Sequence, residues 1–343
     1  MGCCNGLLAV YLGMKIVFFS AQPYDKAFFT QFNQYQHELI FIDIPLSEQT
    51  ADLAAGATAV CVFVNDKVTA GVIQKLAAGK TQIIALRCAG FNNVDIEAAK
   101  AAGIKVCRVP AYSPEAVAEH AVAMLLTLNR KTHKAYNRVR EQNFSLQGLL
   151  GYNLHGKTVG VIGTGNIGKA FCKIMLGFGC KVVAFDLIAN KEVEADGVEY
   201  QPLLEVLKAD IISLHCPLNE QTKHLINKET MAYMKPGVVL INTSRGGLIN
   251  TRDAIKALKS GQLSALGIDV YEQEEKLFFR NLSEDIIQDD EIQRLMSFPN
   301  VLITAHQAFF TQEAMEQIAT TTLNNIQLLS ENAKLDTQAA LLA

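Results

Sequence analysis

The chain has 343 residues; half are hydrophobic, 19% are charged, and the formal net charge is −3. This length accommodates two domains of ordinary size with ample core. The weak negative charge gives no reason to expect nucleic acid or an anionic membrane as a partner, and no run reaches the roughly 18 apolar residues of a membrane span.

The cysteines and histidines lack the spacing of a disulfide framework or a metal site. The eight cysteines are scattered, and no pair has zinc-site or thioredoxin-like spacing. None of the seven histidines forms an HxxxH or HExxH cluster. We therefore expect reduced, mostly buried thiols, no bound metal and a cytoplasmic location.

The first 13 residues differ from the rest of the chain. Residues 1–4 (MGCC) resemble a lipidation signal, but Gly6 stands where the myristoylation pattern has Ser or Thr. No basic residues precede the apolar segment, as they would in a secretory signal. Met14 is followed at once by a predicted strand, so we expect residues 1–13 to be an N-terminal extension: an upstream translation start or an expression remnant.

Apolar runs typical of strands alternate with helical patterns along the whole chain, which indicates two doubly wound α/β domains. The first series predicts strands near 15–19, 38–42, 58–64, 82–86 and 104–107, with helices near 25–36, 69–78 and 94–102. The second predicts strands near 158–162, 181–185, 210–214, 237–242, 265–270 and 300–304. Between the two series we expect a long helical stretch from Pro114 to about Arg140. Residues 277–297 are predicted to be an irregular, solvated excursion, and 312–329 a final helix.

A glycine fingerprint opens the second series. The strand at 158–162 leads into Gly163-x-Gly165-x-x-Gly168, a helical pattern follows, and the next strand ends at Asp186, 18 residues after the last glycine. In this context the first glycine permits the tight turn, the second lets the backbone approach a pyrophosphate, and the third lets the helix lie close to the strand. The acid would bind the adenosine ribose hydroxyls and repel a 2′-phosphate, so the motif predicts an NAD site.

Three later strands end in residues that suit hydride transfer to a 2-oxo acid. Arg245 lies in a Gly-rich turn, where a guanidinium can hold a carboxylate with two hydrogen bonds. Asp269 and a group of glutamates follow the next strand, and His306 ends the last one. A carboxylate beside the histidine would raise its pKa and let it donate a proton to the carbonyl oxygen. These residues leave open which of Glu272, Glu274 and Glu275 is the partner.

With these motifs the chain resembles the D-isomer-specific 2-hydroxyacid dehydrogenases from about Met14 to the last helix. The motifs that carry the resemblance are GTGNIG at 163–168, LHCP at 214–217, NTSRG at 242–246, DVYE at 269–272 and HQA at 306–308. The resemblance implies that Arg245 binds the substrate carboxylate, that His306 is the general acid/base, and that Glu274 pairs with it. Asp269 would assist the electrostatics of the histidine and lie near the nicotinamide.

The resemblance also implies the rest of the site and the domain layout. A Rossmann NAD-binding domain (112–308) would be inserted in a flavodoxin-like catalytic domain (14–111 plus 309–343). The backbone N–H groups of Ala89 and Gly90 would hold the carboxylate, and Tyr112 and Phe309 would face the substrate. The cofactor would be lined by Gly163, Gly165, Asn166, Ile167, Gly168, Asp186, His215, Cys216, Pro217, Thr243, Ser244, Arg245, Asp269 and His306. The final helix would pack on the first domain, and the helical stretch at 114–140 would form a homodimer or homotetramer contact.

The expected function is the NADH-dependent, reversible reduction of pyruvate to D-lactate, as in the fermentative branch of the family. The pairing of His306 with an acid argues against formate dehydrogenase, a relative with glutamine at that acid position. Asp186 argues against the NADP-dependent reductases of glyoxylate and hydroxypyruvate. Two alternatives stay open: a related enzyme for a bulkier 2-oxo acid, and an NAD(H)-sensing binding protein like the corepressors that share this fold.

Overall fold

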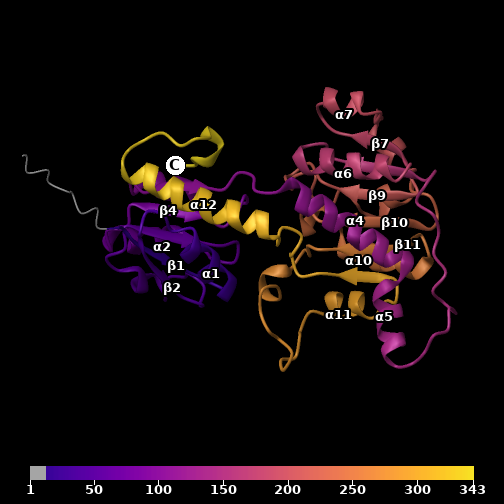
Figure 1. Ribbon diagram of the computed structural model, residues 1–343, viewed down its shortest axis with the longest axis horizontal. Coiled ribbons are helices and arrows are strands. Elements are labelled where there is room, and N and C mark those ends of the chain that lie inside the picture. The colour runs from indigo at the N-terminus through magenta and orange to yellow at the C-terminus, as the bar shows by residue number, and fades with distance from the viewer. Residues whose placement is uncertain (1–12) are drawn as a thin grey trace, which may run out of the picture. The chain divides into compact units, whose positions relative to one another are not determined.

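The computed structural model describes residues 13–343 (Figure 1), so the prediction for the N-terminal extension lies almost entirely outside the described residues. The chain divides into two compact units. One comprises residues 13–113 together with Thr311–Ala343, and the other comprises Pro114–Phe310. Within the described part of the chain, no helix is both long and apolar enough to cross a membrane.

The first unit contains a five-stranded parallel sheet in the order β2-β1-β3-β4-β5, which is the flavodoxin-like order. The strands are β1 (Lys15–Phe18), β2 (Glu38–Phe41), β3 (Ala59–Val62), β4 (Ile83–Leu86) and β5 (Lys105–Arg108). Helices α1 (Pro23–Gln31), α2 (Ala70–Ala78) and α3 (Ile96–Ala101) connect them, with a short 3₁₀ turn η1 (Ala51–Ala54). Every residue of β3 and β4 is buried, as expected for central strands covered on both faces.

The last segment of the chain returns to this unit, as the resemblance implied. Helix α12 (Gln312–Ser330) packs on it, and the Tyr35 hydroxyl donates to Asn324 Oδ1 over 2.8 Å (Figure 1). Residues beyond the 3₁₀ turn η4 (Gln338–Ala340) then lie along β5, an edge strand of the sheet. Leu341 forms an antiparallel bridge with Cys107, so this segment covers backbone groups that an edge strand would otherwise expose.

The second unit contains a seven-stranded parallel sheet in the order β12-β11-β10-β9-β6-β7-β8. Counted from β6, the order from the opposite edge is 3-2-1-4-5-6 with one further strand, which is the Rossmann arrangement. The strands are β6 (Thr158–Ile162), β7 (Lys181–Phe185), β8 (Glu199–Tyr200), β9 (Ile211–Leu214), β10 (Val238–Asn242), β11 (Leu263–Ile268) and β12 (Val301–Ile303). The predicted class, two doubly wound α/β domains, is confirmed.

The helices of the second unit surround this sheet. They are α4 (Pro114–Arg130), α5 (Thr132–Arg140), α6 (Asn166–Gly177), α7 (Lys191–Ala195), α8 (Leu203–Val206), α9 (Lys228–Met231), α10 (Thr251–Ser260) and α11 (Asp290–Met296). Two 3₁₀ turns, η2 (Gly246–Leu248) and η3 (Glu274–Lys276), follow β10 and β11. The turn η2 comes directly after Arg245, and Glu274 opens η3, so both turns carry predicted site residues.

Two sequence predictions need correction here, and one short strand was missed. The stretch from Pro114 to Arg140 is two helices, because Lys131 adopts a left-handed backbone (φ 51°) between them. Helix α4 buries an apolar face, whereas no residue of α5 is buried. Residues 277–297 are not irregular throughout: Asp289 caps α11, and its Ile292 and Leu295 are buried. The two-residue strand β8 was not predicted.

Candidate active site

The three fingerprint glycines meet different surroundings at the start of α6. A Cβ on Gly168 would lie 2.0 Å from the carbonyl oxygen of Gly163, so the helix lies directly against the turn. Gly163 has a φ of +93°, and a Cβ there would lie only 2.6–2.7 Å from backbone atoms of His215 and Cys216. A Cβ on Gly165 would meet nothing within 4 Å. Gly165 is also the N-cap of α6 and has no side chain to cap the first-turn N–H groups. The space beside Gly165 is therefore open at a helix N-terminus, where the uncapped N–H groups suit a pyrophosphate.

Asp186 is held against this loop at the end of β7. Its Oδ2 accepts hydrogen bonds from the backbone N–H of Thr164 at 2.6 Å and from the Thr164 hydroxyl at 3.1 Å. The Tyr200 hydroxyl, on β8, donates to the same threonine oxygen at 2.8 Å. The carboxylate thus has a fixed orientation beside the glycine loop. Sequence reasoning found Asp186 but missed Thr164 and Tyr200, which orient it.

Two of the predicted cofactor residues after β9, His215 and Cys216, have uncharged side chains. Burial lowers the pKa of His215 to about 3, and its Nε2 lies 2.8 Å from the Ser213 hydroxyl. Burial raises the pKa of the Cys216 thiol to about 11. The Ser244 hydroxyl donates to the carbonyl of Cys216 over 2.7 Å, which ties the β10 loop to this segment. Both the imidazole and the thiol are therefore neutral at pH 7 and contribute shape rather than charge.

The loop after β10 presents Arg245 to solvent. The buried Asn242 shapes this loop: its Nδ2 donates to the carbonyl of Arg245 at 2.9 Å, and its Oδ1 accepts from the Ser244 N–H at 3.0 Å. The Arg245 side chain is exposed, and its Nη1 donates to the carbonyl of Ser244 at 2.7 Å. The hydroxyl of Thr243 is buried and has no hydrogen-bond partner within the described residues. An orphaned donor at a predicted cofactor position is consistent with a polar ligand there.

His306 and Glu274 form a pair. The Nδ1 of His306 lies 2.9 Å from Glu274 Oε1, and both side chains are about one-quarter exposed. The second carboxylate oxygen of Glu274 accepts from the backbone N–H of Tyr271 at 2.8 Å, which holds the acid in place. Because Nδ1 is engaged by the acid, Nε2 is the nitrogen left to exchange a proton with a ligand. The ring of Phe279 lies 5.8 Å from the imidazole, a neighbour that the sequence did not reveal.

Asp269 supports the turn that carries His306. The carboxylate accepts from the backbone N–H groups of Gln307 and Ala308, each at 2.9 Å, and from the Thr304 hydroxyl. Its main-chain carbonyl accepts from the His306 N–H at 2.7 Å. Asp269 therefore reaches His306 through backbone, whereas its carboxylate lies 3.5 Å from Nε2 of His120 on α4.

The surroundings of Asp269 keep it ionised. Burial disfavours the charged carboxylate, but hydrogen bonds from His120, Thr304 and the amides of Ala308 and Gln307 outweigh that effect, so its pKa lies below the ordinary value. His120 also lies 3.1 Å from the Thr304 hydroxyl. His120 is not among the site residues that the sequence predicted.

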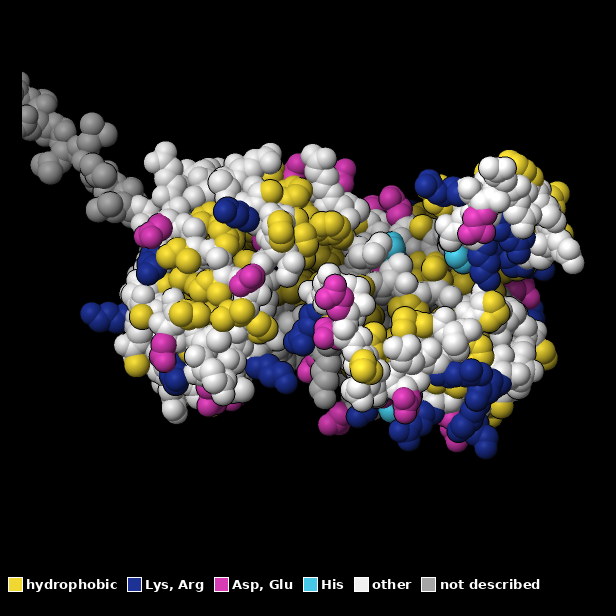
Figure 2. Space-filling model, turned by 90° about the horizontal axis from the view of Figure 1, so that it is seen from below, with side chains coloured by type: hydrophobic (Ala, Val, Ile, Leu, Met, Phe, Trp, Pro, Cys, Tyr) yellow, Lys and Arg dark blue, Asp and Glu magenta, His cyan; other side chains and the backbone are white. Residues whose placement is uncertain are grey.

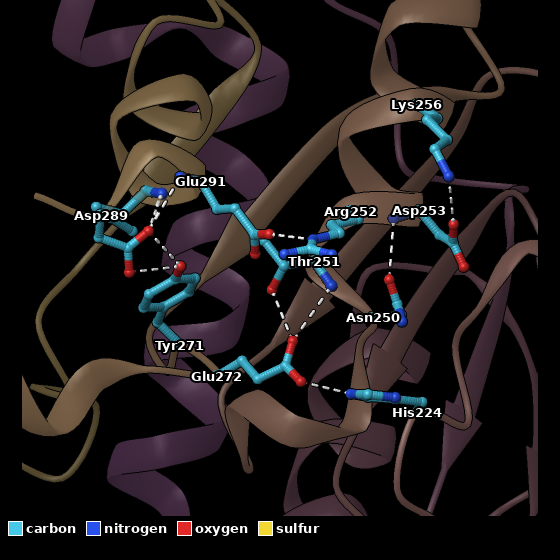
Figure 3. Close-up of polar contacts among 11 residues, drawn as sticks. His224, Asn250, Thr251, Arg252, Asp253, Lys256, Tyr271, Glu272, Asp289 and Glu291 are labelled. Atoms are coloured by element: carbon cyan, nitrogen blue, oxygen red, sulfur yellow. Dashed lines mark hydrogen bonds and ion pairs between the residues drawn. The ribbon is translucent and has the colours of Figure 1, made fainter.

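Glu272 belongs to a different network (Figure 3). One carboxylate oxygen lies 2.5 Å from Nε2 of His224, and the other accepts from the N–H and hydroxyl of Thr251 at 3.4 and 3.1 Å. The figure shows Glu272 reaching from the segment after β11 to both partners. The sequence left open which glutamate pairs with His306. In the structure Glu274 contacts His306, whereas Glu272 contacts His224.

The first unit carries Ala89, Gly90 and Tyr112, three of the remaining predicted residues. Ala89 and Gly90 lie in the turn after β4, which begins at the buried Arg87. Within the described residues, no acceptor contacts the amide nitrogens of Ala89 and Gly90, so both N–H groups are available to a ligand. Tyr112 lies near the end of this unit, before α4 begins. Phe309 belongs to the second unit, where it is buried with its ring 6.0 Å from that of Phe310.

The site residues of the second unit thus follow neighbouring strands of one sheet. Arg245 follows β10, Asp269 and Glu274 follow β11, and His306 follows β12, while the glycine loop follows β6. In a parallel sheet these ends lie at one edge, which is where ligands bind. The arrangement places a histidine–glutamate pair and an exposed guanidinium at the same edge as the glycine loop.

Comparisons with known proteins agree with this geometry. The profile described as "D-isomer specific 2-hydroxyacid dehydrogenase, NAD binding domain" matches residues 122–308, more than half of the chain. The chain therefore belongs to the D-isomer specific 2-hydroxyacid dehydrogenase family. The predictions of an NAD-dependent oxidoreductase and of NAD as its cofactor are confirmed.

Individual relatives cover almost the whole chain. It is 55% identical over 316 residues to 2-hydroxyacid dehydrogenase homolog 1 of Schizosaccharomyces pombe, which covers 91% of this chain and 95% of that protein. It is 50% identical over 320 residues to the D-lactate dehydrogenase of Escherichia coli, covering 93% and 97%. A solved structure of the pyruvate reductase of Chlamydomonas reinhardtii has a TM-score of 0.91 at 45% identity, covering 95% of this chain and 99% of that one.

Proposed function

We propose that this dehydrogenase reduces pyruvate to D-lactate with NADH, reversibly, with His306 as the general acid and Arg245 as a carboxylate anchor. The observation that carries the proposal is the pair formed by His306 and Glu274, 2.9 Å apart at the ligand-binding edge of the NAD-binding sheet. The names of the relatives support the substrate, since one is a D-lactate dehydrogenase and another a pyruvate reductase.

The proton comes from His306. Glu274 holds Nδ1, so Nε2 of the imidazolium faces the substrate and donates to the carbonyl oxygen as that oxygen gains negative charge. In the reverse direction the neutral imidazole takes the hydroxyl proton back. Asp269 keeps the turn at 306–308 rigid through its two backbone hydrogen bonds, which keeps the donor in position.

The carboxylate of the substrate is held by a cation and by backbone amides. The guanidinium of Arg245 is exposed and can make two parallel hydrogen bonds to a carboxylate. The amides of Ala89 and Gly90 supply two more donors. Tyr112 and Phe309 would bound the methyl side of the substrate. Binding of the carboxylate fixes the position of C2 of the 2-oxo acid and leaves its carbonyl oxygen accessible to His306.

The cofactor would be held by the second unit. The loop at 163–168 would receive the pyrophosphate, Asp186 the adenosine ribose, and the segments at 215–217 and 243–245 the nicotinamide half. When bound, the reduced nicotinamide supplies the hydride that adds to C2. Because His215 and Cys216 are neutral, these two side chains place no charge next to the nicotinamide ring.

The test is oxidation of NADH with a panel of 2-oxo acids, together with chiral analysis of the product. Pyruvate should have the highest kcat/KM and give D-lactate. A higher kcat/KM for phenylpyruvate or 2-oxoisocaproate would assign the enzyme to a bulkier substrate, and an L-product would refute the proposal. His306→Gln should lower kcat by roughly 10²- to 10⁴-fold while NADH affinity is kept. Retained activity would remove His306 from the role of acid.

We also propose that the protein is a homodimer or a homotetramer. Apolar side chains of Tyr136, Val139, Phe144, Leu146 and Leu150 are largely exposed on and after α5. Figure 2 shows Lys and Arg side chains gathered in the right-hand part of the view, and α5 itself is basic, with Arg138 and Arg140 in its last turn. Several large apolar side chains exposed along one short segment are a feature of protein–protein contacts. Light scattering coupled to size exclusion gives the mass, and a monomer at micromolar concentration would contradict the proposal.

A further inference from the structure

Arg108 joins three parts of the first unit. It is the last residue of β5 and pairs in register with Leu86, the last residue of β4, so it lies beside the turn that contains Ala89 and Gly90. Its Nη1 donates to the carbonyl of Ala89 at 2.7 Å. The guanidinium carbon lies 5.0 Å from the ring centre of Phe91.

The other side of this guanidinium is bound to the returning segment of the chain. Its Nε donates to the carbonyl of Ala339, in η4, at 3.0 Å. The main-chain carbonyl of Arg108 accepts from Nδ2 of the buried Asn325 at 3.1 Å. Hydrogen bonds therefore hold Arg108 at both its backbone and its side chain, so the guanidinium has a fixed position next to residues 89–91.

The contact with Ala89 fixes the direction of an amide that binds substrate in the proposed function. The Ala89–Gly90 peptide is planar and trans, so the carbonyl of Ala89 and the N–H of Gly90 point in opposite directions. Holding the carbonyl on Arg108 therefore aims the Gly90 N–H away from the guanidinium. A cation on the carbonyl also polarises the peptide and makes its N–H a stronger donor.

We propose that Arg108 is a positioning residue for substrate binding: it orients and polarises the Ala89–Gly90 peptide that receives the carboxylate. This inference rests on the proposed function of that peptide. Arg108 has its partners on protein, so its role is separate from that of Arg245. Because the carboxylate is held in both the ground state and the transition state, loss of Arg108 weakens both equally. It therefore raises KM and leaves kcat nearly unchanged.

Lys105 provides a matched control on the same strand. Its Nζ donates to the carbonyl of Leu329 and to Oδ1 of Asn332, each at 2.7 Å. Like Arg108, it ties β5 to the returning segment of the chain. Among the described residues, the Lys105 side chain makes no hydrogen bond to residues 88–91. Truncating it therefore removes the same kind of contact without touching the turn that contains Ala89 and Gly90.

The experiment compares Arg108→Ala, Arg108→Lys and Lys105→Ala in the full-length enzyme. For each we measure KM and kcat for pyruvate, the Ki of oxamate (a carboxylate isostere of pyruvate), the Kd of NADH and Tm. Arg108→Ala should raise KM and Ki about tenfold, with kcat and the NADH Kd within about twofold of wild type. Arg108→Lys should lie between, since lysine offers one donor where the guanidinium offers a fixed fork. Lys105→Ala should lower Tm and leave KM and Ki unchanged.

Chemical rescue supplies a readout that a purely structural role would not move. Guanidinium ion, at concentrations far below those that denature proteins, should lower the KM of Arg108→Ala and not that of Lys105→Ala. A KM and Ki for Arg108→Ala equal to those of wild type would overturn the inference while the proposed function stands. So would equal increases in both alanine variants. If the wild-type enzyme prefers another 2-oxo acid, that acid replaces pyruvate in the same comparison. If the wild-type enzyme turns over no 2-oxo acid, both the proposed function and the proposed role of Arg108 are refuted.

Discussion

Replacing Gly165 with alanine separates cofactor binding from folding. A Cβ at this position meets nothing within 4 Å, and the backbone (φ −62°, ψ −166°) is one that alanine adopts without strain. The variant should therefore gain about 0.4–1 kcal/mol, because alanine restricts the unfolded chain more than glycine does. The same methyl group enters the space where a pyrophosphate would lie, and such overpacking costs about 1–3 kcal/mol of binding. That corresponds to a roughly 5- to 150-fold higher Kd for NADH.

The assays are calorimetry of the ligand-free protein and fluorescence titration with NADH. Tm should rise by about 1–4 °C for a unit of this size, while the Kd of NADH increases. Gly168→Ala is the contrast, since its Cβ would lie 2.0 Å from the carbonyl oxygen of Gly163 and α6 would have to retreat. It should lower both Tm and NADH affinity. The reasoning is refuted if Gly165→Ala binds NADH as tightly as wild type, or if it loses stability as Gly168→Ala does.

Three further substitutions test the site. Arg245→Lys should lower kcat/KM for pyruvate by about tenfold or more, because a lysine cannot reproduce two parallel hydrogen bonds; unchanged steady-state kinetics would make Arg245 structural. Glu274→Gln should lower kcat by at least about tenfold, because the imidazolium of His306 loses its charged partner 2.9 Å away; a pH–rate profile identical to that of wild type contradicts this. Asp186→Asn keeps an acceptor for Thr164 and removes the charge, so the preference for NADH over NADPH should fall by about tenfold in kcat/KM. An undiminished preference would mean that another residue selects the cofactor.

Much of the fold was predictable because the information is local. Strands β6 and β7 were predicted with their observed bounds, because short apolar runs rich in valine are typical of buried parallel strands. The glycine fingerprint also depends on a short segment, in which each glycine is required by a turn or by a close backbone contact. Asp186 was found from its spacing alone.

Other features could not be predicted because they depend on contacts distant in sequence. Lys131 adopts a left-handed backbone between α4 and α5, although no proline or glycine in the local sequence marks a break there. The short strand β8 has too few residues to show any periodicity.

The candidate site also has features that the sequence predicted and features that only the structure revealed. Sequence alone determined the types of residue that follow each strand: a guanidinium, several carboxylates and an imidazole, together with an NAD-binding loop. The family resemblance implied that Glu274 pairs with His306, and the structure places the two side chains in contact. Only the tertiary structure showed that Glu272 contacts His224 and that Arg108 binds the carbonyl of Ala89. Composition and periodicity act over a few residues, whereas a hydrogen bond across 32 or 48 positions exists only after the sheet has brought the strand ends to one edge.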